Sequence, residues 1–191
     1  MRKLIAGMKI SADGKFVGPE GFADWVEGWS DDYELTPQID ICLLGAGMYP
    51  GYEQYWTAIQ GAPDKPLPMT GKSPTPGEVA WARFAARTPH YVLSSTLSSA
   101  QWPTTRFVRT LEDVASLKRT TGKDIYLIGG ARTAASLIDA GLVDELRLIA
   151  YPLIAGAGTA LFATTSRRRG LELRQVQQLP GGRVRSTYGI S

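Results

Sequence analysis

The chain has 191 residues and a mass of 20.7 kDa, which is enough to bury a hydrophobic core without disulfides or a structural metal. Hydrophobic residues make up 43% and charged residues 20%, a composition that excludes an intrinsically disordered chain. No apolar run approaches the ~20 residues that span a bilayer. Cys42 and His90 are the only cysteine and histidine, so a Cys/His zinc site is excluded and we expect no bound metal.

The net charge of +3 is unevenly distributed along the chain. Residues 1–65 carry ten acidic and five basic side chains, whereas residues 66–191 carry eight acidic and sixteen basic ones. A basic second half suits a protein that binds an anionic ligand, although a mixed surface without such a role gives the same asymmetry. The lack of an export signal and of paired cysteines predicts a cytoplasmic protein.

Strand and helix signals alternate along much of the chain. In chain order, the patterns predict a strand over 3–10, a loop over 18–30, a short helix over 31–35, a strand over 39–45, a helix over 52–59, a long surface loop over 61–77, a helix over 78–87, and strands over 91–95 and 106–109. Further along they predict a helix that opens at Thr110, a strand over 124–128, a helix over 131–140, and strands over 146–154, 171–177 and 184–190.

This order of elements predicts an α/β fold. Alternating strands and helices favour parallel strands, whereas the last two strands flank Pro180-Gly181-Gly182 and favour an antiparallel hairpin. We therefore expect one domain over residues 1–191, with a mixed, mostly parallel central sheet and a C-terminal antiparallel hairpin.

The sharpest local signal lies in residues 126–133, where a buried strand ends in Gly129-Gly130 and a helix begins at once. The free N–H groups of such a helix start favour anions, and glycine lets a phosphate approach the backbone. Taken alone, two glycines are better explained by a tight turn. However, the strand ends at 45–47 and 94–96 are also rich in glycine or hydroxyl groups, and ligands of open α/β sheets bind at such ends. Together the three segments predict a nucleotide site.

Other motifs fall short of the pattern that their chemistry needs. The Gly-x-Gly-x-x-Gly fingerprint is absent because the segment from Gly45 ends in Pro50, so an ordinary Rossmann dehydrogenase is not expected. No Gly-x-Ser-x-Gly motif accompanies His90, which disfavours a serine hydrolase. The basic run at 167–169 is short and has no interleaved aromatic residues. We therefore expect no nucleic-acid partner, and no membrane partner.

Carboxylates gather around Trp25 and Trp29. Aromatic rings beside carboxylates can hold a flat heterocycle, although a solvated acidic loop whose tryptophans cover the core explains the same pattern. Asp31 and Asp32 are the candidates for supplying a catalytic proton, directly or through water.

In their order and spacing, these segments resemble the dihydrofolate reductase-like superfamily, most closely the reductase domain of bacterial riboflavin biosynthesis and its stand-alone relatives. The similarity covers nearly the whole chain. The segments that carry it are 4–14, 43–45, 93–95, 125–133, 142–146 and 152–158. The resemblance implies a three-layer α/β/α fold, NADPH as the usual cofactor and a homodimer, to which the apolar strand over 146–154 would contribute if it lies near a sheet edge.

The resemblance also assigns residues to the cofactor. Those implied to contact NADPH, or NADH in its place, are Ala6, Ile10, Gly14, Gly45, Ser94, Ser95, Ile128, Gly129, Gly130, Ala131, Arg132 and Thr133. Ala6 and Ile10 would border the nicotinamide, residues 129–133 would hold the pyrophosphate, and the serines would lie near the adenosine phosphate. Family members often carry a basic residue directly after the glycine at position 45, where this chain has Ala46. We therefore expect a reduced preference for NADPH over NADH.

The leading hypothesis is a reductase that transfers a hydride from NAD(P)H to a small heterocyclic substrate, such as a pyrimidine or a pterin-like compound. The alternative is a non-catalytic nucleotide- or ligand-binding protein that retains the reductase fold. Oxidation of the cofactor in the presence of candidate substrates distinguishes the two.

Overall fold

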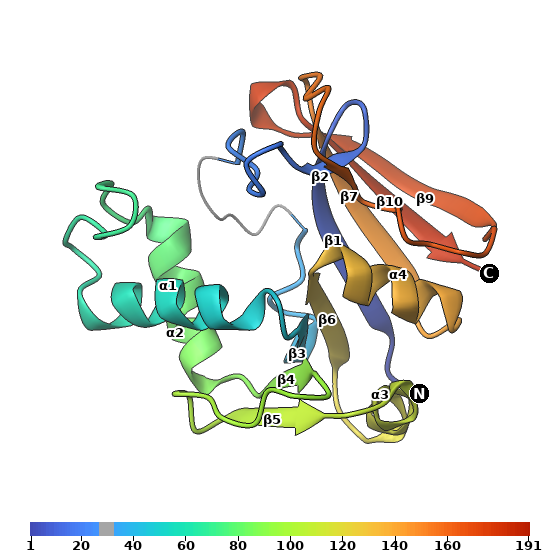
Figure 1. Ribbon diagram of the computed structural model, residues 1–191, viewed down its shortest axis with the longest axis horizontal. Helices are drawn as coiled ribbons and strands as arrows, with labels where there is room; N and C mark the ends of the chain where they lie inside the picture. The colour runs from blue at the N-terminus through green and yellow to red at the C-terminus, as the bar shows by residue number, and fades with distance from the viewer. Residues whose placement is uncertain (27–32) are drawn as a thin grey trace.

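The computed structural model describes residues 1–26 and 33–191 (Figure 1). The strands of its main sheet are β1 (Leu4–Ser11), β3 (Ile39–Gly45), β4 (His90–Leu93), β5 (Thr105–Val108), β6 (Asp124–Gly129), β7 (Glu145–Tyr151), β9 (Leu171–Gln178) and β10 (Val184–Ile190). A separate antiparallel pair consists of β2 (Lys15–Val17) and β8 (Thr159–Ala160). The helices are α1 (Tyr49–Gly61), α2 (Pro76–Arg87), α3 (Leu111–Arg119) and α4 (Ala131–Asp139), with a 3-10 turn η1 (Pro180–Gly182). Among the described residues, no helix is long and apolar enough to cross a membrane.

The strands of the main sheet lie in the order β5-β4-β3-β6-β1-β7-β10-β9. All neighbours from β5 to β7 are parallel, and β10 is antiparallel to both β7 and β9. This arrangement confirms the mixed, mostly parallel sheet and the C-terminal antiparallel hairpin. Because β1, β6, β3 and β4 are parallel neighbours, their carboxyl ends meet at one edge of the sheet.

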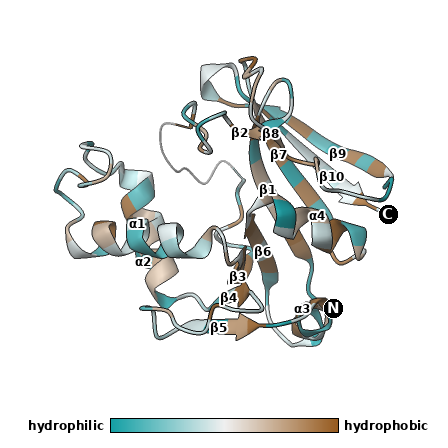
Figure 2. Ribbon diagram, in the orientation of Figure 1, coloured by the Kyte–Doolittle hydropathy of each residue, from teal (hydrophilic) through white to brown (hydrophobic). Residues whose placement is uncertain are grey.

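Helices cover both faces of the sheet, because the central strands send apolar side chains to both sides. In β1, Ile5 belongs to the core under α1 and α2, whereas Leu4 and Ala6 belong to the core under α3 and α4. The residues of β3 and β6 divide between the two cores in the same way. Figure 1 shows α1 and α2 grouped apart from α3 and α4, and Figure 2 shows hydrophobic residues concentrated in the central strands. The three-layer α/β/α fold is confirmed.

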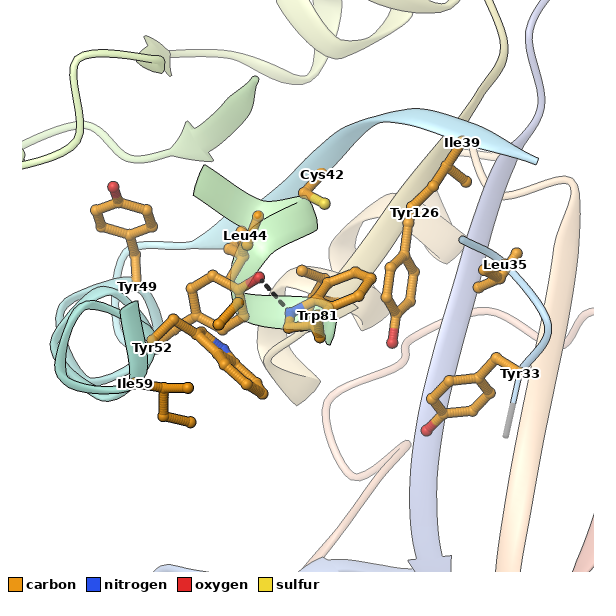
Figure 3. Packing of buried hydrophobic residues seen from close by; sticks show 14 of the residues in the cluster. Tyr33, Leu35, Ile39, Cys42, Leu44, Tyr49, Tyr52, Ile59, Trp81 and Tyr126 are labelled. Carbon is orange, nitrogen blue, oxygen red and sulfur yellow. Dashed lines mark hydrogen bonds between the residues drawn. The ribbon is translucent and has the colours of Figure 1, made fainter. Parts of the chain in front are cut away.

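The core under α1 and α2 is rich in aromatic side chains (Figure 3). Trp81 Nε1 donates to the Tyr52 hydroxyl at 3.1 Å, and this hydroxyl lies 3.2 Å from His90 Nε2. His90 Nδ1 lies 2.8 Å from the Thr88 carbonyl oxygen, so we assign the proton to Nδ1 and let Nε2 accept from Tyr52. Burial lowers the pKa of His90 to about 4, which keeps the ring neutral near pH 7. This network ties both helices to the sheet.

The four helix starts fall into two kinds. Thr75 and Glu78 form a capping box at α2, and Thr110 forms one at α3. By contrast, α1 begins after Met48 and α4 after Gly130, and neither of these residues makes a side-chain cap. The helix α4 therefore keeps its first N–H groups for another acceptor, whereas α1 has Pro50, which has no N–H, in its first turn.

Apart from shifts of one to three residues in the bounds of elements, the structure differs from the sequence predictions in three places. Residues 33–35, the described part of the predicted helix over 31–35, are not helical, since Glu34 has a φ of +56° and Arg147 binds the Tyr33 carbonyl. The strand predicted over 146–154 is not near an edge, because β7 lies between β1 and β10 and the edge strand is β9. The β2–β8 pair was not predicted, because such short strands show no alternation.

Candidate functional site

A cavity of about 930 Å³ lies where the carboxyl ends of β3 and β6 meet the middle of β1. Its wall also includes β2, part of the loop over 21–26, and residues from α1 and from the loop that joins α1 to α2. The volume falls within the range of about 300–1,000 Å³ that is typical of cofactor and small-molecule sites. Its position matches the sheet edge at which the sequence predicts a ligand.

The start of α4 forms one wall of the cavity. Gly129 has a φ of +146°, a conformation that favours glycine, and its peptide bond to Gly130 is cis. A Cβ built on Gly130 would meet no heavy atom within 4 Å, so open space lies beside this backbone. Because no side chain caps α4, its first N–H groups and the positive end of its dipole are available to a ligand in that space.

Glycine at position 45 allows the end of β3 to touch the start of α4. A Cβ built on Gly45 would overlap the hydroxyl of Thr133. Gly47 and Met48, which follow in the turn to α1, also line the cavity. Met48 Sδ would lie 3.1 Å from a Cβ on Gly129, so the turns after β3 and β6 are in close contact. The two glycine-rich strand ends therefore form one continuous surface.

The charged side chains that line the cavity, among the described residues, are Lys9 and Arg132. Lys9 is half-buried on β1, and Arg132 is exposed in the first turn of α4. Both are cations, and the described lining contains no carboxylate. Arg132 and the positive end of the α4 dipole make the start of α4 electropositive, which favours an anionic ligand there.

Aromatic rings line another part of the cavity. The ring centroids of Tyr33 and Tyr126 lie 6.0 Å apart, and Figure 3 shows the two side chains as neighbours. A Cβ on Gly7 would lie 2.9 Å from Tyr126 Cε2 and 3.3 Å from Tyr33 Cδ1, so glycine here makes room for both rings. The Tyr55 hydroxyl donates to Glu78 Oε1 at 2.7 Å, which leaves mainly the ring of Tyr55 for the cavity. This region suits a flat, partly apolar ligand.

The structure brings half of the expected cofactor residues together. Those that line the cavity are Gly45, Ile128, Gly130, Ala131, Arg132 and Thr133. Gly129 is buried directly behind them. Ala6 and Ile10 lie on the other face of β1, where they pack with the core under α3 and α4. Gly14 lies in the turn between β1 and β2, where its N–H donates to the Ser11 carbonyl at 2.9 Å.

The two serines lie at the end of β4, beside the cavity and outside its lining. Ser94 is buried, and its hydroxyl accepts from Leu97 N at 2.8 Å. Arg109 binds the carbonyl oxygens of Ser94 and Leu97, both at 2.7 Å, so the turn is held by the protein itself. Ser95 is exposed. The Ala46 N–H donates to the Leu93 carbonyl at 3.3 Å, which places Ala46 next to this turn.

The candidate proton donors Asp31 and Asp32 lie outside the described residues. Of the acidic residues near the N-terminal loop, Asp13 is held by its neighbours: it accepts from Ser11 Oγ at 2.6 Å and from Ala155 N and Gly156 N, both at 2.9 Å. These hydrogen bonds lower the pKa of Asp13 to about 2. Asp13 therefore ties the β1–β2 turn to the loop after β7. No group of three or more His, Cys, Asp or Glu residues in the described ranges could hold a metal ion.

The sequence prediction missed several residues of the cavity. They include Gly7, Lys9, Tyr33, Tyr55, Thr70 and Tyr126. Gly7 and Lys9 alternate along β1 with Ala6 and Ile10, which stay predicted cofactor residues; Met8, on the same face as Ala6, also lines the cavity. Tyr55 and Thr70 come from a helix and a loop that no local motif connects to the glycine-rich strand ends.

Comparisons with known proteins agree with this geometry. The profile of the RibD C-terminal domain family matches residues 2–184. The chain is 29% identical over 194 residues to the uncharacterized protein YyaP of Bacillus subtilis (strain 168), which covers 98% of this chain and 94% of that one. A putative riboflavin biosynthesis protein from Shewanella sp. PV-4 has a similar structure, with a TM-score of 0.70, 16% identity and 99% of each chain covered.

A pyrimidine reductase-like protein from Corynebacterium diphtheriae is also similar, with a TM-score of 0.61 and 16% identity over 100% of this chain and 92% of that one. At such identities the structural matches establish the fold. The match to the family model concerns the candidate site as well as the fold, because the matched residues include both glycine-rich strand ends and the start of α4. The chain therefore belongs to the RibD C-terminal domain family, whose fold is that of the dihydrofolate reductase-like reductases.

Proposed function

We propose that the protein is an NADPH-dependent reductase of the cytoplasm that transfers a hydride to a small heterocycle, a pyrimidine or a pterin-like compound. The observation that carries this proposal is a single cavity with two chemically different parts. One part is cationic and rich in exposed backbone at the start of α4, and the other is lined by the rings of Tyr33 and Tyr126. The first suits the phosphates of a dinucleotide and the second a flat ring.

The residues present fit the cofactor. The N–H groups of Ala131, Arg132 and Thr133 would hold the pyrophosphate, with Gly130 leaving space for its approach. The Arg132 guanidinium would add a charged donor at the mouth of the cavity. Bound in this way, the reduced nicotinamide supplies the hydride. The protein's own contribution is to hold both reactants in one geometry and to keep water out.

The aromatic part of the cavity would hold the substrate. The rings of Tyr33, Tyr55 and Tyr126 provide apolar contact area, and Lys9 provides a donor for an acceptor atom of the heterocycle. A proton must reach the substrate as well. Asp31 and Asp32, which directly precede Tyr33 in the sequence, are the proposed source, directly or through water. Two of the similar proteins are named a putative riboflavin biosynthesis protein and a pyrimidine reductase-like protein. These names support a pyrimidine as the first compound to test.

Turnover with a panel of heterocycles tests the proposal. The protein is mixed with NADPH and, separately, with 5-amino-6-(5-phosphoribosylamino)uracil, dihydrofolate or simpler pyrimidines, and the absorbance of the reduced nicotinamide is followed. We expect oxidation of NADPH with at least one of them. NADPH binding without oxidation by any of them would favour the alternative, a ligand-binding protein that retains the fold. Absence of NADPH binding would contradict the proposal outright.

A further inference from the structure

Beyond their paired ends, β1 and β7 continue into the small second sheet. Ser11 and Tyr151 are the last register pair of these two parallel strands. The chain leaves β1 through a tight turn into β2 and leaves β7 through a longer loop into β8, and β2 and β8 pair antiparallel. Figure 2 shows the two short strands side by side, past the ends of β1 and β7. We call residues 12–18 and 153–161 the two halves of a flap.

The flap forms one wall of the cavity. Phe16 and Val17 of β2 and Thr159 of β8 line it. Phe16 reaches the start of α4, since its Cζ would lie 3.7 Å from a Cβ built on Gly129. Gly158 has a φ of +114°, and a Cβ there would overlap the Val17 carbonyl oxygen, so glycine is needed for β8 to lie this close to β2. The position of the flap therefore determines how enclosed the cavity is beside α4.

The strands of the flap are too short to hold this position by themselves. β2 has three residues and β8 has two, and the register between them is irregular. Two further backbone hydrogen bonds join the halves, from Ala12 N to the Leu153 carbonyl at 2.8 Å and from Leu161 N to the Gly14 carbonyl at 3.0 Å. A two-stranded pair is marginally stable at best in water. The flap therefore depends on additional contacts at its base.

Asp13 supplies such contacts between the two halves. Its Oδ1 accepts from Ser11 Oγ on its own turn at 2.6 Å and from Ala155 N on the other half at 2.9 Å. Its Oδ2 accepts from Gly156 N at 2.9 Å. A carboxylate accepts all three of these bonds at once, and hydrogen bonds to an ionised acceptor are stronger than those between neutral groups. One side chain thus joins both halves of the flap.

We infer that Asp13 is a positioning residue of the site: its carboxylate holds the flap against the start of α4 and so keeps Phe16 and Val17 beside the space that a ligand would occupy. The inference rests on the proposed reductase only for the identity of that ligand. Without the carboxylate, the flap spends part of its time displaced. A ligand that requires the closed flap then binds in proportion to the fraction of molecules in which the flap is closed.

Asp139 provides a matched control, because it has the same kinds of partner elsewhere in the chain. It accepts from Ser166 Oγ at 2.6 Å, from Ser166 N at 2.8 Å and from Arg167 N at 3.2 Å, which ties the end of α4 to the loop after β8. None of these three residues lines the cavity. Asp13→Ala and Asp139→Ala therefore remove equivalent hydrogen bonds, and only the first of them touches the flap.

Three measurements test the inference: hydrogen exchange of the Leu161 N–H, the emission of added anilinonaphthalene sulfonate, and calorimetric titration of NADPH. In Asp13→Ala the Leu161 amide should exchange faster, and the dye should emit more strongly because it binds apolar surface that the displaced flap exposes. NADPH affinity should fall about tenfold if roughly one molecule in ten keeps the flap closed. Asp139→Ala should match the wild type in all three. Asp13→Asn, which keeps one acceptor oxygen, should lie between Asp13→Ala and the wild type.

Exchange of the Leu161 amide at the wild-type rate in Asp13→Ala would overturn the inference. So would dye emission that rises no more than in Asp139→Ala, or faster exchange with unchanged NADPH affinity, since the flap would then not position the site. A wild type that does not bind NADPH would contradict the proposed function instead. In that case the exchange and the dye emission decide whether Asp13 holds the flap over the cavity.

Discussion

Tyr52 connects two buried groups through a single hydroxyl, which accepts from Trp81 and donates to His90. Tyr52→Phe keeps the ring but leaves the Trp81 N–H and the His90 Nε2 without a partner. An orphaned buried polar group costs about 1–3 kcal/mol, so we expect the free energy of unfolding in urea to fall by an amount in or above that range. Tyr91→Phe, which removes a hydroxyl from a half-buried residue of β4, is the control. Equal losses in the two variants would show that the network adds nothing.

The side chain at position 46 is expected to affect the preference of the protein for NADPH over NADH. It lies directly after Gly45 and beside the turn at Ser94, where the resemblance places the adenosine phosphate. A methyl group offers no donor to a 2′-phosphate, whereas a hydrogen bond to a charged group contributes roughly 1.5–3 kcal/mol, or about one to two decades in affinity. Ala46→Arg should therefore increase the ratio of NADPH to NADH affinity by up to that factor. Both cofactors are titrated at fixed ionic strength; an unchanged ratio would mean that residue 46 does not face the 2′-phosphate.

Among the connecting elements, the β1–β2 turn depends on one carboxylate. Hydrogen bonds from Ser11, Ala155 and Gly156 lower the pKa of Asp13 from its ordinary 3.8 to about 2. A depressed pKa in the folded state means that the stabilisation is present above the unfolded pKa and is lost as the pH falls toward 2. We expect wild type to have a higher Tm than Asp13→Asn at pH 6, and the difference to shrink between about pH 4 and pH 2. A difference that stays constant across this range would contradict the role of the charge.

The sequence predicts the elements of this protein well where burial imposes a pattern, and poorly elsewhere. The strand over 39–45 and the strand over 184–190 have the predicted bounds, because both are covered by neighbours and their composition reflects this. The helix predicted over 31–35 is wrong for its described residues, since the Tyr33 carbonyl is bound by Arg147, a contact over more than a hundred positions. In the site, glycine marks the strand ends, but no local signal marks Gly7 to Lys9 of β1 as residues of the cavity.

At the scale of the whole molecule, pairing between strands that are far apart in the sequence determines which residues meet in the cavity. The distribution of charge along the chain does not show this. The second half of the chain is basic and contributes Arg132 to the cavity, yet Lys9, the other cation, comes from the acidic first half. β1 lies between β6 and β7, so the N-terminal strand is built into the centre of a sheet made largely from later residues. The cavity is therefore assembled from both halves of the chain, while one domain over residues 1–191 stays a prediction.

The central claim is that the start of α4 binds a dinucleotide. Calorimetric titration of NADPH into the wild type and into Gly130→Val tests it most directly. A Cβ at Gly130 meets no protein atom, so the fold should persist, while the side chain occupies the space of the phosphates and should weaken binding by about one to two decades. Gly51→Val, at an equally open position outside the cavity, is the control and should bind as the wild type does. Equal NADPH affinity in a folded Gly130→Val protein would contradict the account.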